Sequence, residues 1–185
     1  MQNVMLIEAF RDFFYYGQSS QMRTAYVTIT AECGRDAQPG MINWELEEFT
    51  FNRLFVGPMA PLAPAIASVY LDPEGLIQGP VTKEIRNFYR SIGLSLEEVG
   101  REPEDSLAYE LDACRYLLLL SREEPEAQKI YDQFINEHLS HWFFKFYSRA
   151  IEHCAESVAV RSVLILLLEW LNTETGKNLQ YKETE

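Results

Sequence analysis

The chain has 185 residues, 47% apolar and 13% aromatic, which suits one sizeable hydrophobic core and excludes a disordered chain. Its 28 acidic and 16 basic residues give a formal charge of -12, which disfavours nucleic acid and anionic membrane surfaces as partners and favours a cationic one. Three separated cysteines form no Cys-x-x-Cys pair, as expected in a reducing cytoplasm.

The N-terminal residues and the most apolar segment predict the location of the protein. Residues 1–10 contain no Lys or Arg, so they lack the charged region of an export signal. The apolar segment 163–168 lies between Arg161 and Glu169 and is too short to span a bilayer. We therefore expect a cytoplasmic protein without stable membrane insertion.

Helical spacing of apolar residues predicts three helices in the first third of the chain. The first ends at Gly17, the second ends at Gly34, and the third begins near Asn43 and runs to Phe55. The β-branched residues 27–30 also fit a strand, and the sequence leaves that alternative open.

A proline-rich segment follows at residues 57–80, where helical spacing disappears. Five of the eight prolines lie here, together with Ala65, Ile66, Val69 and Tyr70, which are too apolar for a floppy linker. We expect a long ordered loop packed against the helices.

The second half of the chain again has helical spacing. Pro103 is predicted to occupy the first helical position of a helix that lasts to about Ser121. The other predicted helices cover 82–93, 125–139, 142–154 and 160–171. The pattern predicts an all-α, single-domain multi-helix bundle over 1–176, with a charged tail at 177–185. A division into 1–94 and 103–176, joined by the connector 95–102, is the alternative.

Sequence motifs of common enzymes are missing. There is no phosphate-binding loop and no serine in a nucleophile elbow, so we expect no catalytic residues. His138 and His141 could share a helix face, but metal sites need three or four ligands. No metal and no cofactor are therefore predicted. A weak GTP hydrolase and a metal-handling helper of a soluble partner stay open as alternatives.

An acidic turn, Glu-Pro-Glu-Asp at 102–105, is compatible with two roles. Carboxylates near a helix start stabilise that helix by about 0.3–1 kcal/mol each at exposed sites. Several carboxylates beside a connector can instead bind arginines of a partner, because a guanidinium bonds carboxylates bidentately.

A group of apolar residues, Phe51, Leu54 and Phe55, lies at the start of the proline-rich loop. Such residues usually belong to the core, but at this position they can also line a groove that receives an apolar peptide.

Several motifs in order resemble the TorD/DmsD/NarJ family of redox-enzyme maturation chaperones. They are Arg-Leu-Phe-Val-Gly-Pro at 53–58, Ser-Val-Tyr-Leu-Asp at 68–72, the segment 82–93, Glu-Pro-Glu-Asp at 102–105, and Leu139 with Trp142 and Phe146. The resemblance covers about residues 40 to 170. It implies an all-helical cytoplasmic chaperone that is not an enzyme.

The resemblance also implies partners. Members bind the twin-arginine signal peptide and the apo form of a molybdenum-cofactor oxidoreductase of the dimethyl sulfoxide reductase type, and hold it until the cofactor is inserted before export. Some members bind guanine nucleotides weakly, and some form domain-swapped dimers, so the oligomer is expected to be a monomer or such a dimer.

Site residues follow from the resemblance position by position. Glu102, Glu104 and Asp105 are expected to contact the arginines of the peptide, with Ser106 beside them. The apolar segment is expected to contact Phe51, Leu54, Phe55 and Tyr70. Two positions depart from the family pattern: Ser106 stands where the family usually has His, and Ala65-Ile66-Ala67 stands where Pro-Trp-Glu or Pro-Trp-Gly is common. Both lie in regions tied to peptide binding, so they bear on which partner is bound.

Overall fold

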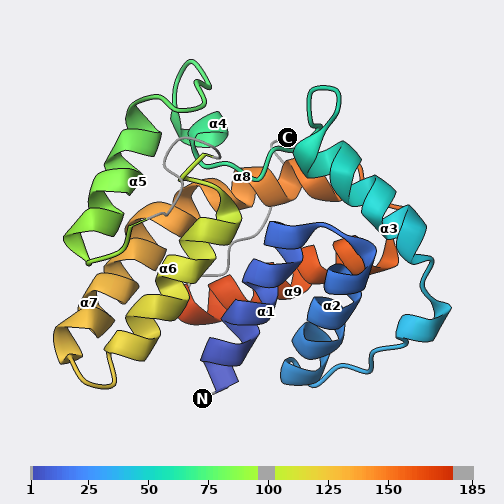
Figure 1. Cartoon of the computed structure of the whole chain (residues 1–185), viewed down its shortest axis with the longest axis horizontal. Helices are drawn as coiled ribbons and strands as arrows, with labels where there is room; N and C mark the ends of the chain where they lie inside the picture. The colour runs from blue at the N-terminus through green and yellow to red at the C-terminus, as the bar shows by residue number, and fades with distance from the viewer. Residues whose placement is uncertain (1, 96–102, 177–185) are drawn as a thin grey trace.

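The computed structural model describes residues 2–95 and 103–176, and this part of the chain is helical apart from loops and an isolated β-bridge (Figure 1). The prediction of an all-α fold is confirmed. The elements are α1 (Gln2–Tyr16), α2 (Ser19–Glu32), η1 (Pro39–Met41), α3 (Trp44–Phe51), η2 (Asn52–Val56), α4 (Ser68–Leu71), α5 (Pro80–Ser91), α6 (Leu107–Leu120), α7 (Pro125–Phe134), η3 (Ile135–Leu139), α8 (Ser140–Ile151) and α9 (Val158–Thr175). Residues 27–30 belong to α2, not to a strand.

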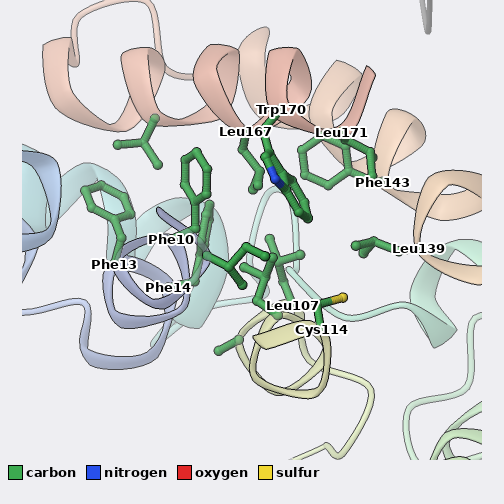
Figure 2. Close-up of a cluster of buried hydrophobic side chains, with 14 of the residues drawn as sticks. Phe10, Phe13, Phe14, Leu107, Cys114, Leu139, Phe143, Leu167, Trp170 and Leu171 are labelled. Atoms are coloured by element: carbon green, nitrogen blue, oxygen red, sulfur yellow. The ribbon is translucent and has the colours of Figure 1, made fainter. Parts of the chain in front are cut away.

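Helix α1 lies near the centre of the bundle, where it packs against both α2 and α6. Its Phe10 ring lies 6.2 Å, between centroids, from the ring of Trp170 on α9. Figure 2 shows the cluster around this contact, to which both halves of the chain contribute: Phe10, Phe13, Phe14, Leu107, Cys114, Leu139, Phe143, Leu167, Trp170 and Leu171. The two predicted subdomains therefore share this core. Most of the predicted connector, 96–102, and the predicted tail, 177–185, lie outside the described residues.

The structure contains two π-helical turns, η2 and η3, and η3 alters the expected helix boundaries. The prediction of separate helices at 125–139 and 142–154 is wrong, because α7, η3 and α8 follow one another without a break and the junction residues Phe134 and Leu139 keep right-handed helical backbone angles. A π turn accommodates an extra residue and shifts the apolar stripe around the helix. The sequence pattern therefore suggests two helices where the backbone is continuous. The other π turn, η2, directly extends α3 to Val56, in agreement with the helix predicted to run to Phe55.

The proline-rich segment is ordered, as predicted. Ala63, Ala67 and Ser68 are fully buried in it, and residues 68–71 form the short helix α4. The following helix begins at Pro80, two residues before the expected Thr82, with proline at its first position.

A buried carboxylate on α3 connects that helix to α9. Glu47 accepts hydrogen bonds from the backbone N–H of Val158 (2.8 Å) and of Val160 (3.0 Å), and from the Ser157 hydroxyl. Because the N–H groups at a helix start have no partner within the helix, Glu47 satisfies them from a distant part of the sequence. No helix in the described ranges is long and apolar enough to cross a membrane.

Gly17, which ends α1, allows a close contact with Phe51. Its φ is 63°, and a Cβ at this position would lie 2.4 Å from Cε1 of the Phe51 ring. We expect Gly17→Ala to lower the free energy of unfolding by about 2–4 kcal/mol, because it combines a strained backbone with overpacking. Urea denaturation measures this. Gly34→Ala is the matched control, since Gly34 has φ +64° and nothing within 4 Å of the added Cβ. An equal decrease in the free energy of unfolding in the two variants would show that the close contact with Phe51 adds nothing to the cost of Gly17→Ala.

Candidate functional site

Glu104 and Asp105 of the acidic turn are buried, and their carboxylates bind groups within the protein. Helix α6 begins at Leu107, so the prediction that Pro103 occupies the first helical position is wrong. The Asp105 side chain is fully buried, and it accepts hydrogen bonds from the Ser68 backbone N–H (2.7 Å) and from the Thr82 hydroxyl (2.9 Å). Asp105 therefore connects the turn to the starts of α4 and α5.

Glu104 is held in a similar way. Its side chain is 1% exposed and forms an ion pair with Arg86 of α5 at 2.7 Å, and its backbone carbonyl accepts a hydrogen bond from the Tyr89 hydroxyl at 3.0 Å. Both carboxylates are buried and fasten the fold in this structure, although Oε2 of Glu104 has no hydrogen-bond partner among the described residues. Glu102 lies outside the described residues.

The turn also pairs with the proline-rich loop through an antiparallel bridge between Ile66 and Ser106. Ala67 N–H donates to the Asp105 carbonyl, and Leu107 N–H donates to the Ala65 carbonyl, both at 2.9 Å. Because these bonds flank the bridge and do not join Ile66 to Ser106, the two residues form a non-hydrogen-bonded antiparallel pair. In such a pair the two side chains lie close together. The two positions that depart from the family pattern thus lie opposite each other.

This bridge forms one wall of a cavity of about 360 Å³, here called the aromatic pocket. Its lining residues come from α1, from α3 with η2, from the proline-rich loop and from the acidic turn with the start of α6: Phe14, Tyr15, Tyr16, Phe51, Asn52, Phe55, Val56, Ala65, Ile66, Pro103, Ser106, Leu107 and Ala108. The pocket brings together Phe51, Phe55 and Ser106 of the predicted site.

Two predicted residues lie away from this lining. Leu54 is fully buried in the core. Tyr70 stacks on Trp142 of α8 at 5.8 Å between ring centroids, and burial raises the pKa of Tyr70 to about 12. The sequence interpretation missed the contribution of α1. The feature of the sequence that could have indicated this contribution is the pair Tyr15-Tyr16 directly before Gly17. Both of these aromatic residues are about half exposed (50% and 49%).

A second cavity, of about 440 Å³, lies between α1 and α2 and is here called the α1–α2 groove. It is lined by Met5, Glu8, Ala9, Asp12, Tyr16, Ser20, Gln21, Thr24, Ala25 and Thr28. Tyr16 lines both the groove and the aromatic pocket, so the two cavities adjoin at the end of α1.

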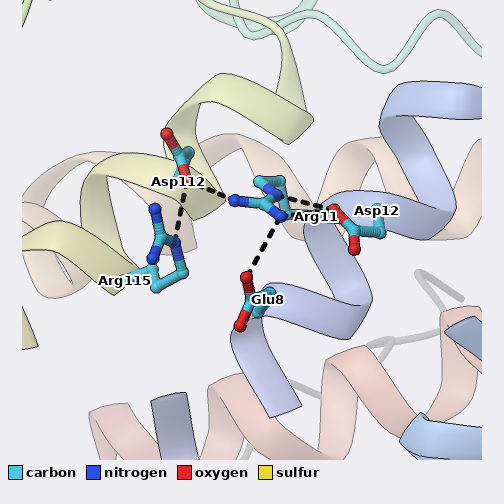
Figure 3. Close-up of polar contacts among 5 residues, drawn as sticks. All are labelled: Glu8, Arg11, Asp12, Asp112 and Arg115. Carbon is cyan, nitrogen blue, oxygen red and sulfur yellow. Dashed lines mark hydrogen bonds and ion pairs between the residues drawn. The ribbon is translucent and has the colours of Figure 1, made fainter. Parts of the chain in front are cut away.

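Beside the groove lies a cluster of charged side chains that joins α1 to α6 (Figure 3). Arg11 binds Asp112 at 2.8 Å, and Arg115 binds the same carboxylate at 2.9 Å. Burial alone would raise the pKa of Asp112, but the hydrogen bonds from the two arginines outweigh it and lower that pKa. Arg11 also contacts Glu8 and Asp12 on its own helix.

The two histidines proposed for a metal site lie in different surroundings. His138 binds Glu110 at 2.7 Å, between Nε2 and Oε1, and its ring stacks on Phe134, whereas His141 is exposed. Within residues 2–95 and 103–176, no group of three or more His, Cys, Asp and Glu side chains could hold a metal ion.

The fold defined by these elements is that of redox-enzyme maturation proteins. The chain superposes on the crystal structure of a candidate redox enzyme maturation protein from Archaeoglobus fulgidus with a TM-score of 0.65 and 17% sequence identity, over 91% of this chain and 93% of that one. At this identity the likeness concerns the fold alone.

Residues 19–148 match the family described as nitrate reductase delta subunit. The chain therefore belongs to this family of redox-enzyme maturation chaperones, which includes NarJ, TorD and DmsD, and the resemblance found in the sequence is confirmed. The family consists of chaperones rather than enzymes, as the sequence predicted.

Two groups of relatives are similar over part of the chain. The Tat proofreading chaperone DmsD of Salmonella typhimurium is 32% identical over 105 residues, which is 56% of this chain and 48% of that protein. The chaperone protein TorD of Vibrio cholerae serotype O1 is 32% identical over 108 residues, 55% of this chain and 49% of that protein. The matches thus span about half the length of these relatives.

Proposed function

We propose that this protein is a cytoplasmic chaperone that binds the twin-arginine signal peptide and the apo form of an exported molybdenum-cofactor oxidoreductase of the dimethyl sulfoxide reductase type. It shields the signal peptide and holds the apoenzyme until the cofactor is inserted, without covalent chemistry of its own. Family membership and the similarity to the Tat proofreading chaperone DmsD and the chaperone protein TorD support this proposal.

The observation that carries the proposal is the aromatic pocket, which we assign to the apolar segment of the signal peptide. Its buried rings, Phe51 and Phe55, form an apolar floor, and Val56, which is 63% exposed, lies at its mouth. Burying apolar peptide surface here is favourable by about 25 cal/mol per Å². A helix or an extended segment can bind such a groove.

The remaining predicted residues have supporting roles in this proposal. Leu54 and Tyr70 pack in the structure that carries the pocket, and Glu104 and Asp105 fix the wall to which Ser106 belongs. Glu102 keeps its proposed role in binding an arginine of the peptide. The charge of -12 favours the approach of a basic signal peptide.

Val56→Lys is expected to weaken binding of the signal peptide about tenfold or more. Lysine removes an apolar contact at the pocket mouth and repels the basic peptide, while a cation at the helical C-terminus leaves stability unharmed. Titration calorimetry against signal peptides of molybdoenzymes encoded nearby measures the effect. The matched control is Val27→Lys on the exposed face of α2, because Val27 lines none of the cavities described above.

The possible outcomes distinguish a wrong assignment of the aromatic pocket from a wrong proposed function. If both lysine variants bind like the unaltered protein, the aromatic pocket is not the site of the apolar segment. If the unaltered protein binds none of the signal peptides at low or moderate salt, the chaperone proposal itself fails.

A further inference from the structure

The α1–α2 groove has a regular arrangement of oxygen atoms on its two sides. On α1, Glu8 and Asp12 are four residues apart and so lie on the same helix face. On α2, Ser20, Thr24 and Thr28 repeat at the same spacing and line the opposite side. Met5, Ala9 and Ala25 add apolar surface to the walls of the groove.

The hydroxyl groups on α2 present acceptors to the groove. Thr24 donates its hydroxyl proton to the Ser20 carbonyl at 3.1 Å, and Thr28 donates to the Thr24 carbonyl at 3.2 Å. Each hydroxyl has a single proton, so what remains is oxygen lone pairs. Together with two carboxylates, and with no Lys, Arg or His among the lining residues, the groove suits a cation that brings several hydrogen-bond donors.

Arg11 holds the two carboxylates without using up their acceptors. Its guanidinium reaches a single oxygen of each: Oδ1 of Asp12, and Oε1 of Glu8 at 3.4 Å (Figure 3). The other oxygens, Oδ2 and Oε2, have no hydrogen-bond partner among the described residues. Arg11 and Arg115 face the carboxylates of Glu8, Asp12 and Asp112, two positive charges against three, so the cluster keeps a net negative charge.

The position of the groove connects it to the aromatic pocket. Tyr16 lines both cavities, so a peptide that fills the pocket with its apolar segment can extend past this ring into the groove. The whole of α1 precedes the residues matched by the family, 19–148, so that match assigns no role to Glu8 or Asp12.

We infer that the α1–α2 groove binds arginine side chains of the basic segment next to the apolar segment of the client peptide, with Glu8 and Asp12 among the carboxylates that contact them. This inference rests on the proposed function. Arginine fits better than lysine because its planar group offers five donors in a fixed arrangement, which can meet carboxylate and hydroxyl oxygens on both walls.

The test uses the full chain and three synthetic peptides that share one leucine-rich segment and carry, ahead of it, two adjacent arginines, two lysines or two glutamines. For the unaltered protein we expect affinity to fall in that order. Glu8→Gln combined with Asp12→Asn should weaken binding of the arginine peptide about three- to tenfold at low salt and leave the glutamine peptide unchanged, because partly exposed ion pairs have modest, salt-screened energies.

The control is Glu126→Gln combined with Asp132→Asn on the exposed face of α7. It changes the net charge by the same amount at two residues that line neither cavity. Thermal unfolding of both double variants checks that the fold is intact. The inference is overturned if the groove variant still prefers the arginine peptide as strongly as the control does, or if the arginine and glutamine peptides bind the unaltered protein equally. The proposed function fails separately, if the leucine-rich segment does not bind at all.

Discussion

Asp105→Ala is expected to lower the free energy of unfolding by about 3–5 kcal/mol, because it leaves two buried donors without an acceptor. The Ser68 N–H and the Thr82 hydroxyl both point at this carboxylate, and neither Ser68 nor Thr82 has any exposed surface. Water cannot replace the lost oxygen atoms without opening the junction of α4, α5 and the acidic turn.

Urea denaturation measures this loss, with Asp132→Ala as the control, because Asp132 is an exposed carboxylate on α7. Thr82→Val removes one donor, so its effect and that of Asp105→Ala should be less than additive in the double variant. A loss no greater for Asp105→Ala than for the control would show that the buried carboxylate does not hold this junction.

The acidic turn shows where sequence reasoning reaches its limit. The sequence indicated a motif at 102–105, but a carboxylate before a helix is compatible with capping, with partner binding and with burial. The partners of Asp105 lie 37 and 23 residues away along the chain, at Ser68 and Thr82. No local pattern encodes such contacts. Glu47 shows the same limit, since the backbone N–H groups that it caps at the start of α9 lie 111 and 113 residues further along the chain.

The helices were more predictable than the site. Most bounds followed from apolar spacing and from Gly17 and Gly34, each of which has a positive φ at or just after a helix end. The π turn η3 was mistaken for a break between two helices, because an extra residue in a turn looks like the end of one apolar stripe and the start of another. The turn η2 lies within the helix predicted to run to Phe55. The lining of the aromatic pocket was predicted only in part. Phe51, Phe55 and Ser106 were predicted site residues, whereas Tyr15 and Tyr16 join the lining only through the packing of α1 in the fold.

A buried network on α6, η3 and α8 should make stability depend on pH. Glu110 is fully buried and accepts hydrogen bonds from Trp142 Nε1 at 2.9 Å, through Oε2, and from His138 at 2.7 Å, through Oε1. We expect Glu110→Ala to lower the free energy of unfolding by about 3–5 kcal/mol, since the change leaves the indole N–H and the histidine without their shared acceptor.

The direction of the pH effect follows from the shifts in the pKa of Glu110 and in the pKa of His138. Burial raises the pKa of Glu110. Burial alone would lower the pKa of His138, but the carboxylate of Glu110, aided by Asp105 and Glu84, outweighs it and raises that pKa above its ordinary 6.5. The folded pair therefore holds its protons to a higher pH than the unfolded chain does. The contribution of protonated His138 to the stability of the fold is fully present below about pH 6.5. It is lost as the pH rises through the folded-state pKa of His138.

Urea denaturation from about pH 6 to about pH 9 tests this against Glu110→Gln combined with His138→Gln, which preserves hydrogen-bonding groups but removes both titrations. The difference in unfolding free energy between the unaltered protein and this variant should shift steadily in favour of the variant as the pH rises, because only the unaltered protein loses bound protons from the pair. A difference that stays constant over that range, or shifts the other way, would mean that His138 is not held protonated by Glu110 in the folded protein.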